Sequence, residues 1–285
     1  MIVGRVAGVC IRVNLVFLLL AALYVVLGMG LEVLIIVTSL VIHEMAHALV
    51  ARLLGVKVSD IEILPFGGQA RMEDINGLEP EIEIYIALAG PLVSLSLAGM
   101  CYFLHIWPTP AGIFLIRLNL GLGLFNLLPA LPLDGGRIIR AAFSGHLGFK
   151  RATSYAALLG QIIGVGMVGT GTWLSLRDIS AINLIILGIL LLWAAHREKL
   201  YLAYAFMRFL INKKAELART GLLESRQVVA RPSTLITRIL DNAQPTHYLI
   251  VVVMDERDSV VGMLGEAHLI ETLLETGPRA TLQDC

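Results

Sequence analysis

Charged residues are scarce in this chain of 285 residues, of which Asp, Glu, Lys and Arg together make up 15%. Soluble domains carry about 25% charged residues. Here 57% of the residues are hydrophobic, and the mean hydropathy is +0.80. This composition predicts an integral membrane protein. The 22 basic and 22 acidic residues cancel, so the chain lacks the positive excess typical of nucleic-acid binding.

Cysteine is also rare, and its three positions follow no motif. Cys10, Cys101 and Cys285 are scattered along the chain. They predict neither a disulfide framework nor a zinc site built from thiolates. Internal repeats and low-complexity tracts are lacking as well.

Six apolar stretches are long enough to cross a bilayer. They cover roughly residues 12–29, 31–54, 80–105, 111–130, 154–176 and 180–206. The boundary between the first two is the weakest, because only residues 28–30 make the turn from one to the other. The pattern predicts a polytopic α-helical membrane protein with about six transmembrane helices.

Basic residues gather at the same ends of these stretches. They precede the first, follow the second and the sixth, and lie between the fourth and the fifth, whereas the opposite loops hold essentially only Arg177. Because loops rich in Lys and Arg stay in the cytoplasm, this bias predicts that both termini are cytoplasmic. An even number of spans gives the same result.

From about Glu216 the apolar runs shorten, and Pro, Asp, Glu and Arg return. We therefore predict a membrane domain over 1–206, a linker over 207–218 and a small cytoplasmic α/β domain over 219–285. The patterns over 219–276 predict strand, helix, strand, strand, helix. The helices are expected at 235–240 and 267–274, and the last two strands at 248–253 and 260–264.

His43, Glu44 and His47 form an H-E-x-x-H motif inside the second apolar stretch. On a helix, this spacing places two imidazoles one turn apart on the same face, with a carboxylate beside them that can act on water at a metal. Ionisable groups at membrane depth cost roughly 2.5–3.5 kcal/mol each. The motif therefore predicts a functional metal site rather than a chance match.

A catalytic zinc site needs a third protein ligand, and Asp134 is the candidate. Pro129 and Pro132 precede it and prevent a regular helix, while Gly135 and Gly136 follow it and permit a close backbone approach. Irregular backbone at membrane depth occurs where it is buried or lines a wet cavity. Asp134 could turn inward to a metal there, or it could be an interfacial acid that caps a helix.

The two motifs together resemble the site-2 protease family of intramembrane zinc metalloproteases. The match combines H-E-x-x-H with N-x-x-P-x-x-x-L-D-G in a later span, carried by His43, Glu44, His47, Asn126, Pro129, Leu133, Asp134 and Gly135. The resemblance implies that one Zn²⁺ is bound by His43, His47 and Asp134, and that Glu44 is the catalytic general base. It also implies a peptide bond in a membrane-associated protein as the substrate.

Four further residues are candidates for positioning the substrate. Asn126 could hold the substrate chain or polarise its carbonyl, or it could form a hydrogen bond between helices. Phe66, Gly67 and Gly68 lie in a segment whose alternation predicts a β-hairpin or a re-entrant loop. An exposed edge there could bind an unwound substrate as an added strand, although a purely structural cytoplasmic hairpin fits the pattern as well.

The C-terminal pattern resembles one cystathionine-β-synthase (CBS) module. Such modules usually pair and often bind adenine nucleotides such as ATP, so a single copy implies a homo-oligomer. His268 stands where that family often has an acid that contacts ribose. A purely regulatory or oligomerising role is therefore as consistent with the sequence as ATP binding.

The whole layout resembles the stage IV sporulation FB branch of site-2 proteases. That branch removes the pro-sequence of a membrane-associated sigma factor at the mother-cell membrane around the forespore, and partner membrane proteins hold it inactive. A housekeeping site-2 protease with another substrate fits the sequence equally well. A membrane sensor or metal transporter is the alternative from another class, but the spans hold no second cluster of His, Asp and Glu.

Overall fold

The structure of the chain is a computed structural model, which describes residues 2–6, 9–56, 58–64, 67–72, 79–198, 221–222, 224–243, 247–277 and 279–285. The chain divides into two compact units, one of residues 1–75 and 81–138 and the other of residues 76–80 and 139–285. The predicted linker over 207–218 lies outside the described residues. Each unit is considered by itself below.

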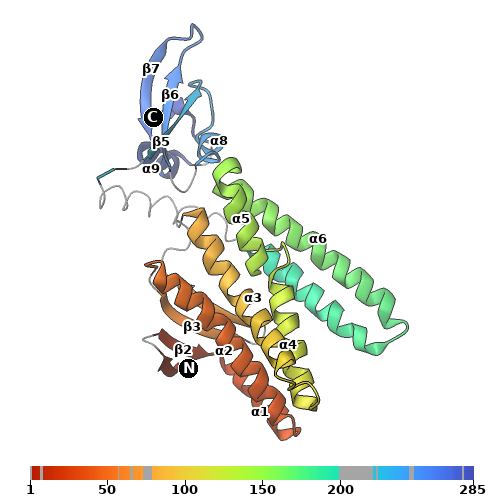
Figure 1. Cartoon of the computed structure of the whole chain (residues 1–285). Coiled ribbons are helices and arrows are strands. Elements are labelled where there is room, and N and C mark those ends of the chain that lie inside the picture. Colours follow the sequence, from red (N-terminus) through yellow and green to blue (C-terminus); the bar gives the residue numbers. More distant parts are fainter. Residues whose placement is uncertain are drawn as a thin grey trace. The chain divides into compact units, whose positions relative to one another are not determined.

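Four apolar helices form most of the first unit (Figure 1). They are α1 (Leu15–Val26), α2 (Gly30–Leu53), α3 (Pro80–Phe103) and α4 (Pro110–Asn126). Each lies in one of the first four predicted stretches. Inside the unit, the Asn119 side-chain amide donates a hydrogen bond to Ser39 Oγ at 2.9 Å, which fixes α4 against α2.

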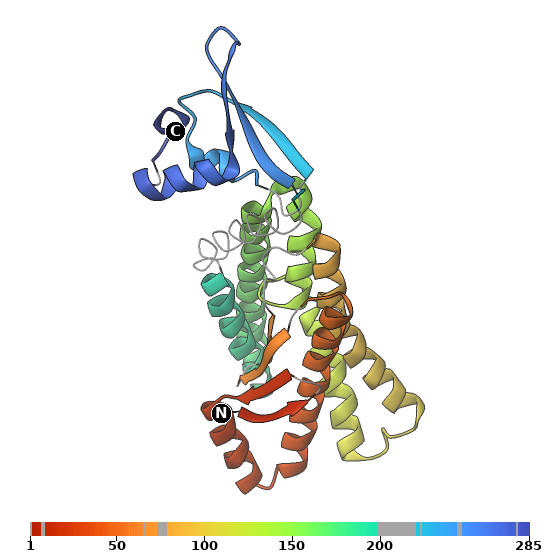
Figure 2. The same cartoon turned by 90° about the vertical axis from the view of Figure 1, so that its left-hand side faces the viewer.

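A four-stranded sheet completes the first unit and lies against α1 and α2 (Figure 2). Its strands, in spatial order, are β1 (Ile2–Val6), β2 (Val9–Val13), β3 (Val58–Leu64) and β4 (Gly67–Met72). The antiparallel pairing of β3 with β4 confirms the predicted hairpin. The sequence did not predict β1 and β2, because the apolar residues of β2 run almost directly into those of α1. The first apolar stretch is therefore predicted to begin at residue 12, three residues before α1 begins.

The second unit contains most of α5 (Asp134–Leu147), then α6 (Phe149–Ser175) and a helix over 182–198. The last two overlap the fifth and sixth predicted stretches, although α6 begins five residues before the fifth, and α5 was not predicted. Glycines let them approach closely, since a Cβ atom on Gly188 would lie 2.9 Å from the carbonyl oxygen of Gly164. Small residues at such contacts are typical of helices that pack in membranes.

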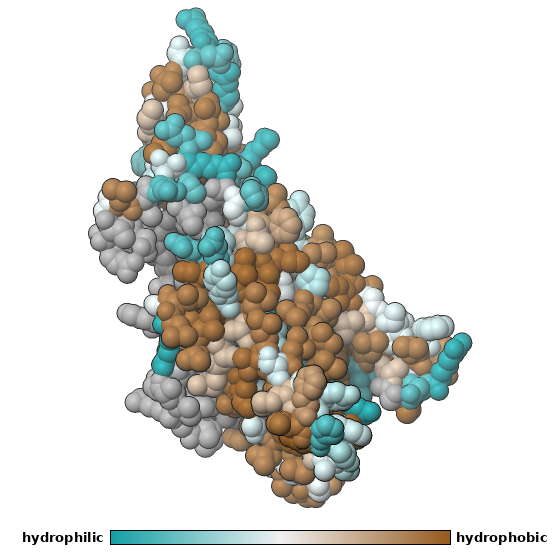
Figure 3. Space-filling model, viewed as in Figure 1, coloured by the Kyte–Doolittle hydropathy of each residue, from teal (hydrophilic) through white to brown (hydrophobic). Residues whose placement is uncertain are grey.

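Three of the described helices, α2, α3 and α6, are long and apolar enough to cross a membrane, while α4 and residues 17–26 form shorter apolar helices. Their large side chains are widely exposed, as at Leu34, Met100 and Val165. Hydrophobic residues cover most of the helical surface in Figure 3. A lipid environment accounts for this exposure, as expected for a membrane protein; six crossings remain a prediction.

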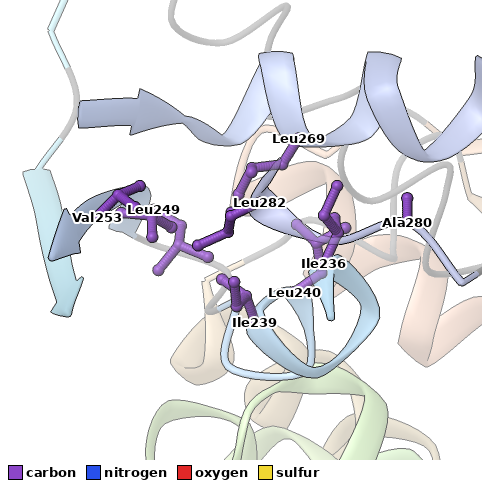
Figure 4. Packing of buried hydrophobic residues seen from close by; sticks show 9 residues of the cluster. Ile236, Ile239, Leu240, Leu249, Val253, Leu269, Ala280 and Leu282 are labelled. Atoms are coloured by element: carbon purple, nitrogen blue, oxygen red, sulfur yellow. The ribbon is translucent and has the colours of Figure 1, made fainter. Parts of the chain in front are cut away.

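The C-terminal module, residues 224–285, folds in the predicted order. Its elements are β5 (Glu224–Ala230), α8 (Ile236–Leu240), β6 (His247–Met254), β7 (Val260–Gly265) and α9 (Glu266–Thr276). Strand β6 lies in the centre, parallel to β5 and antiparallel to β7. One face of this sheet packs on both helices through a core that includes Leu240, Leu249 and Leu269 (Figure 4).

Candidate metal centre

Helix α2 brings the two motif histidines together in the interior of the first unit. His43 and His47 are only 2% and 4% exposed. Their Nε2 atoms lie 3.2 Å apart, and their rings meet edge to face. The four-residue spacing therefore has the predicted effect of aiming both ring nitrogens at one point.

Asp134 supplies the third atom of the cluster from the first turn of α5. Its Oδ2 atom lies 3.3 Å from Nε2 of His43 and 3.2 Å from Nε2 of His47. The positive end of the helix dipole at this position favours an ionised carboxylate. Within the described part of the chain, these three residues form the one such cluster of metal-ligand atoms.

The hydrogen bond on the far side of each imidazole ring bears on which of its two nitrogens carries the proton. Nδ1 of His47 lies 2.7 Å from the carbonyl oxygen of Ile86, and a carbonyl can only accept, so Nδ1 carries the proton. Nδ1 of His43 lies 3.0 Å from Ser94 Oγ. A hydroxyl can accept as well as donate, so this contact permits a proton on Nδ1 of His43 too, and both Nε2 atoms then present bare lone pairs.

This arrangement fits a bound cation. In the tautomer with both protons on Nδ1, two nitrogen lone pairs and a carboxylate oxygen converge, and they repel one another in a buried site unless a cation lies between them. Zinc bonds of about 2.0–2.1 Å in tetrahedral geometry separate neighbouring ligand atoms by about 3.3 Å. The observed separations of 3.2–3.3 Å match that value.

Glu44 follows His43 on α2 and is buried with it. Its carboxyl group interacts electrostatically with both histidines, Asp134 and Arg137. A carboxylate beside a metal cluster, but not part of it, has the placement that a general base requires.

Among the described residues, no hydrogen bond links the remaining predicted site residues to the cluster. The side-chain amide of Asn126 donates to the carbonyl oxygen of Leu122, 2.9 Å away in its own helix. Gly67 and Gly68 begin β4, and Phe66 lies outside the described residues. Their roles in holding a substrate remain predictions.

Sequence reasoning missed the contribution of α3. In the sequence, the small residues among 89–94 indicate only close helix packing. Ile86, Gly90 and Ser94 in fact meet the two imidazoles. Their spacing of four residues, with a buried serine in an apolar span, was the available signal.

Comparison with known proteins agrees with this geometry. Residues 31–109 and 107–167 match peptidase family M50. A solved site-2 protease from Methanocaldococcus jannaschii has a similar fold, with a TM-score of 0.56 and 32% identity over 70% of this chain and 94% of that one. The chain belongs to peptidase family M50, which includes zinc metalloproteases.

Two curated relatives agree with this family. A zinc metalloprotease of Methanocaldococcus jannaschii is 35% identical over 179 residues, which cover 58% of this chain and 51% of that protein. Stage IV sporulation protein FB of Bacillus subtilis is 30% identical over 148 residues, which cover 47% and 48%. The chain thus spans about half the length of these two relatives.

Removing a ligand should remove the metal. We expect purified His43→Ala and Asp134→Ala chains to lose about one zinc per chain, because two remaining ligands do not form a closed site. Metal analysis by mass spectrometry measures this directly. His146→Ala, at an exposed position of α5, is the matched control and should keep its zinc. Equal zinc in all four proteins would show that the metal lies elsewhere.

Proposed function

We propose that this chain is an intramembrane zinc endopeptidase that cleaves a membrane-associated protein. The observation that supports this most strongly is the buried triangle of two Nε2 atoms and one carboxylate oxygen, with Glu44 beside it. The triangle lies among helices that are apolar enough for a bilayer. A metal-ligand triangle with a neighbouring carboxylate, placed among apolar helices, suits hydrolysis of a peptide bond inside the membrane.

His43, His47 and Asp134 would hold the metal. When bound, zinc polarises the peptide carbonyl and lowers the pKa of an attacking water to about 7. Glu44 accepts the proton that this water loses and later donates it to the leaving amine. Burial of the whole cluster strengthens each of these electrostatic interactions.

A metal transporter is the alternative that the site supports less well. Transport needs ligands along a path on both sides of the midplane, whereas hydrolysis needs one cluster and a base. Among the described residues, only His43, His47 and Asp134 form a group of three metal-ligand side chains. Glu44, which is not needed to hold the metal, also favours hydrolysis.

A helical substrate must unwind before its amides can be attacked, and β4 offers an edge to receive it. β4 is an outer strand of the four-stranded sheet, and both β3 and β4 lie against α2, which carries the histidines. Main-chain hydrogen bonds to such an edge hold a peptide extended regardless of its side chains. Phe66, Gly67, Gly68 and Asn126 would then position the peptide.

We propose a membrane-associated transcription factor as the substrate, in particular a sporulation sigma factor whose pro-sequence is removed. The similarity to stage IV sporulation protein FB supports this choice, and the similarity to other zinc metalloproteases supports a housekeeping substrate equally. With the sporulation substrate we would expect inhibitory membrane partners and a place in the mother-cell membrane, with both termini cytoplasmic. Co-expression with a pro-sigma factor would separate the two.

We also propose that the C-terminal module pairs with a second copy. Val229, Val252 and Met263 form one cross-strand row on the sheet face opposite the helices. The two outer members, Val229 and Met263, are 61% and 66% exposed, whereas Val252 between them is 9% exposed. Uncovered apolar faces of this kind mark interaction sites, and a two-fold pair would cover the same face on both copies.

Regulation by an adenine nucleotide remains a second proposal for this module. A cavity of about 380 Å³ is lined by Thr234, Arg238 and Asn242, among others. Arg231 and Arg238, which both line this cavity, could face phosphate groups. His268 stands where an acid would contact a ribose, so pairing without nucleotide is as consistent with this module as nucleotide binding.

The catalytic role of Glu44 has a direct test. We expect Glu44→Gln to keep its zinc but to lose at least about 10²-fold in cleavage rate, the usual contribution of a general base. The assay is cleavage of a co-expressed tethered pro-sigma factor, with metal analysis of the same proteins. Glu81→Gln, an exposed acid at the start of α3, is the control. Normal cleavage by Glu44→Gln would refute the mechanism.

Substrate binding at β4 can be tested by disulfide crosslinking. In an inactive Glu44→Gln chain without native cysteines, we expect Gln69→Cys on β4 to crosslink to a cysteine near the substrate's cleavage site. Ile11→Cys is the control, since β2 is paired on both sides and cannot accept another strand. Crosslinks of equal yield at both positions would contradict the edge-strand proposal.

Because the proposed pair forms through the apolar row of Val229, Val252 and Met263, a charge in that row should disrupt the dimer. We expect Met263→Glu to reduce the full chain from a dimer to a monomer in native mass spectrometry, because the charge would be buried at the pair. Leu222→Glu, exposed outside the sheet, should remain dimeric. A wild-type monomer would end the pairing proposal, and a mass change on adding ATP would support nucleotide control.

A further inference from the structure

One stripe of α3 faces the metal cluster. Ile86, Gly90 and Ser94 follow one another at intervals of four residues, so they share a face of the helix. Ile86 meets His47, and Ser94 meets His43. Helix α3 therefore runs antiparallel to α2 along the two imidazoles, with Gly90 between the two contacts.

We propose that this stripe forms the outer shell of the metal centre and that Ser94 is a positioning residue that sets the orientation and tautomer of His43. This inference rests on the proposed zinc function of the same cluster. Ser94 is 1% exposed, and its Oγ atom lies 3.0 Å from Nδ1 of His43. Partners of this kind orient a metal-binding histidine and make its other nitrogen more basic.

The two imidazoles are held by different kinds of group. His47 donates to a main-chain carbonyl, which every residue at position 86 would supply. His43 instead depends on a side chain, because among the described residues its Nδ1 meets the Ser94 hydroxyl and no main-chain acceptor. With the Nδ1 tautomer that zinc binding through Nε2 requires, loss of that hydroxyl would leave a buried N–H without its acceptor, so the ring would turn or shift its proton to Nε2. Either change removes the lone pair that binds the metal.

Gly90 contributes space rather than a hydrogen bond. A Cβ atom at this position would press on Nε2 of His47 and would lie 2.7 Å from Nε2 of His43. Both of these atoms point at the centre of the cluster. Any side chain at position 90 would therefore push the two nitrogens away from the metal, and the absence of one keeps the coordination space open.

Zinc affinity of the purified full chain tests the proposal without relying on cleavage. We expect Ser94→Ala to weaken zinc binding about 10–100-fold, as is typical when an outer-shell partner is lost, and Gly90→Ala to weaken it further. Titration against a competing chelator gives the affinity. The matched controls on α3 are Ser96→Ala, which is exposed, and Gly99→Ala, whose Cβ would contact nothing within 4 Å. Both should bind zinc as the wild type does.

Cobalt provides a second readout. Bound Co²⁺ absorbs visible light with an intensity that depends on ligand geometry, so Ser94→Ala should change the spectrum while Ser96→Ala should not. If Ser94→Ala does not fold, Ser94→Cys is the second variant, because it keeps the size but bonds more weakly. It should also weaken zinc binding.

Wild-type affinity and spectrum in the Ser94 variants would overturn the positioning role, even if the wild-type chain binds zinc and cleaves its substrate. A wild-type chain that binds no zinc would instead refute the proposed function and, with it, this inference. Zinc binding without cleavage would affect only the proposed protease activity. The two ideas can therefore fail separately.

Discussion

The first unit depends on the convergence of three electron-rich atoms in a buried, apolar place. Nε2 of His43, Nε2 of His47 and Oδ2 of Asp134 lie within 3.3 Å of one another, and a zinc ion would be bound through the lone pairs of all three. Such an arrangement is unfavourable unless a cation occupies the centre. Helix contacts around the cluster, including the Asn119–Ser39 hydrogen bond, hold α2 in place. Without a bound cation, burial of the three polar side chains would not stabilise this packing.

The ligands come from two places in the chain that are far apart in sequence, and each has its own local reason to be where it is. The histidines share a helix face because of their spacing. Asp134 stands where the helical path has been broken by Pro129 and Pro132 and a new helix begins. A carboxylate at a helix start is both well placed and electrostatically favoured. Two ligands thus come from the middle of a regular helix, and the third comes from the point where the chain is interrupted and a new helix starts.

Much of this could be predicted from the sequence, because its signals are local. A fixed spacing of four residues aims His43 and His47 alike, and long apolar runs mark the positions of the helices. The order of strands and helices in the C-terminal module follows from short alternating patterns. In each case the neighbours that decide the structure lie within a few residues.

What the sequence did not predict depends on distant contacts. The strand over 9–13 pairs in parallel with one that begins at Val58, so its partner could not be known from the apolar run that follows it. Ser94 resembles any small residue in a packed span until α2 is placed beside it. Asp134 remained open between ligand and cap for the same reason, since only the fold shows which groups it meets.

The main-chain acceptor at Ile86 has a consequence for how this centre can vary. Since the carbonyl belongs to the backbone, substitution of the side chain at position 86 cannot delete it, and His47 keeps its orientation as long as the helix persists. His43 has no such protection. Substitutions in α3 can therefore remove the hydrogen-bond partner of His43 but not that of His47, so the orientation of His43 is the more sensitive of the two to mutation.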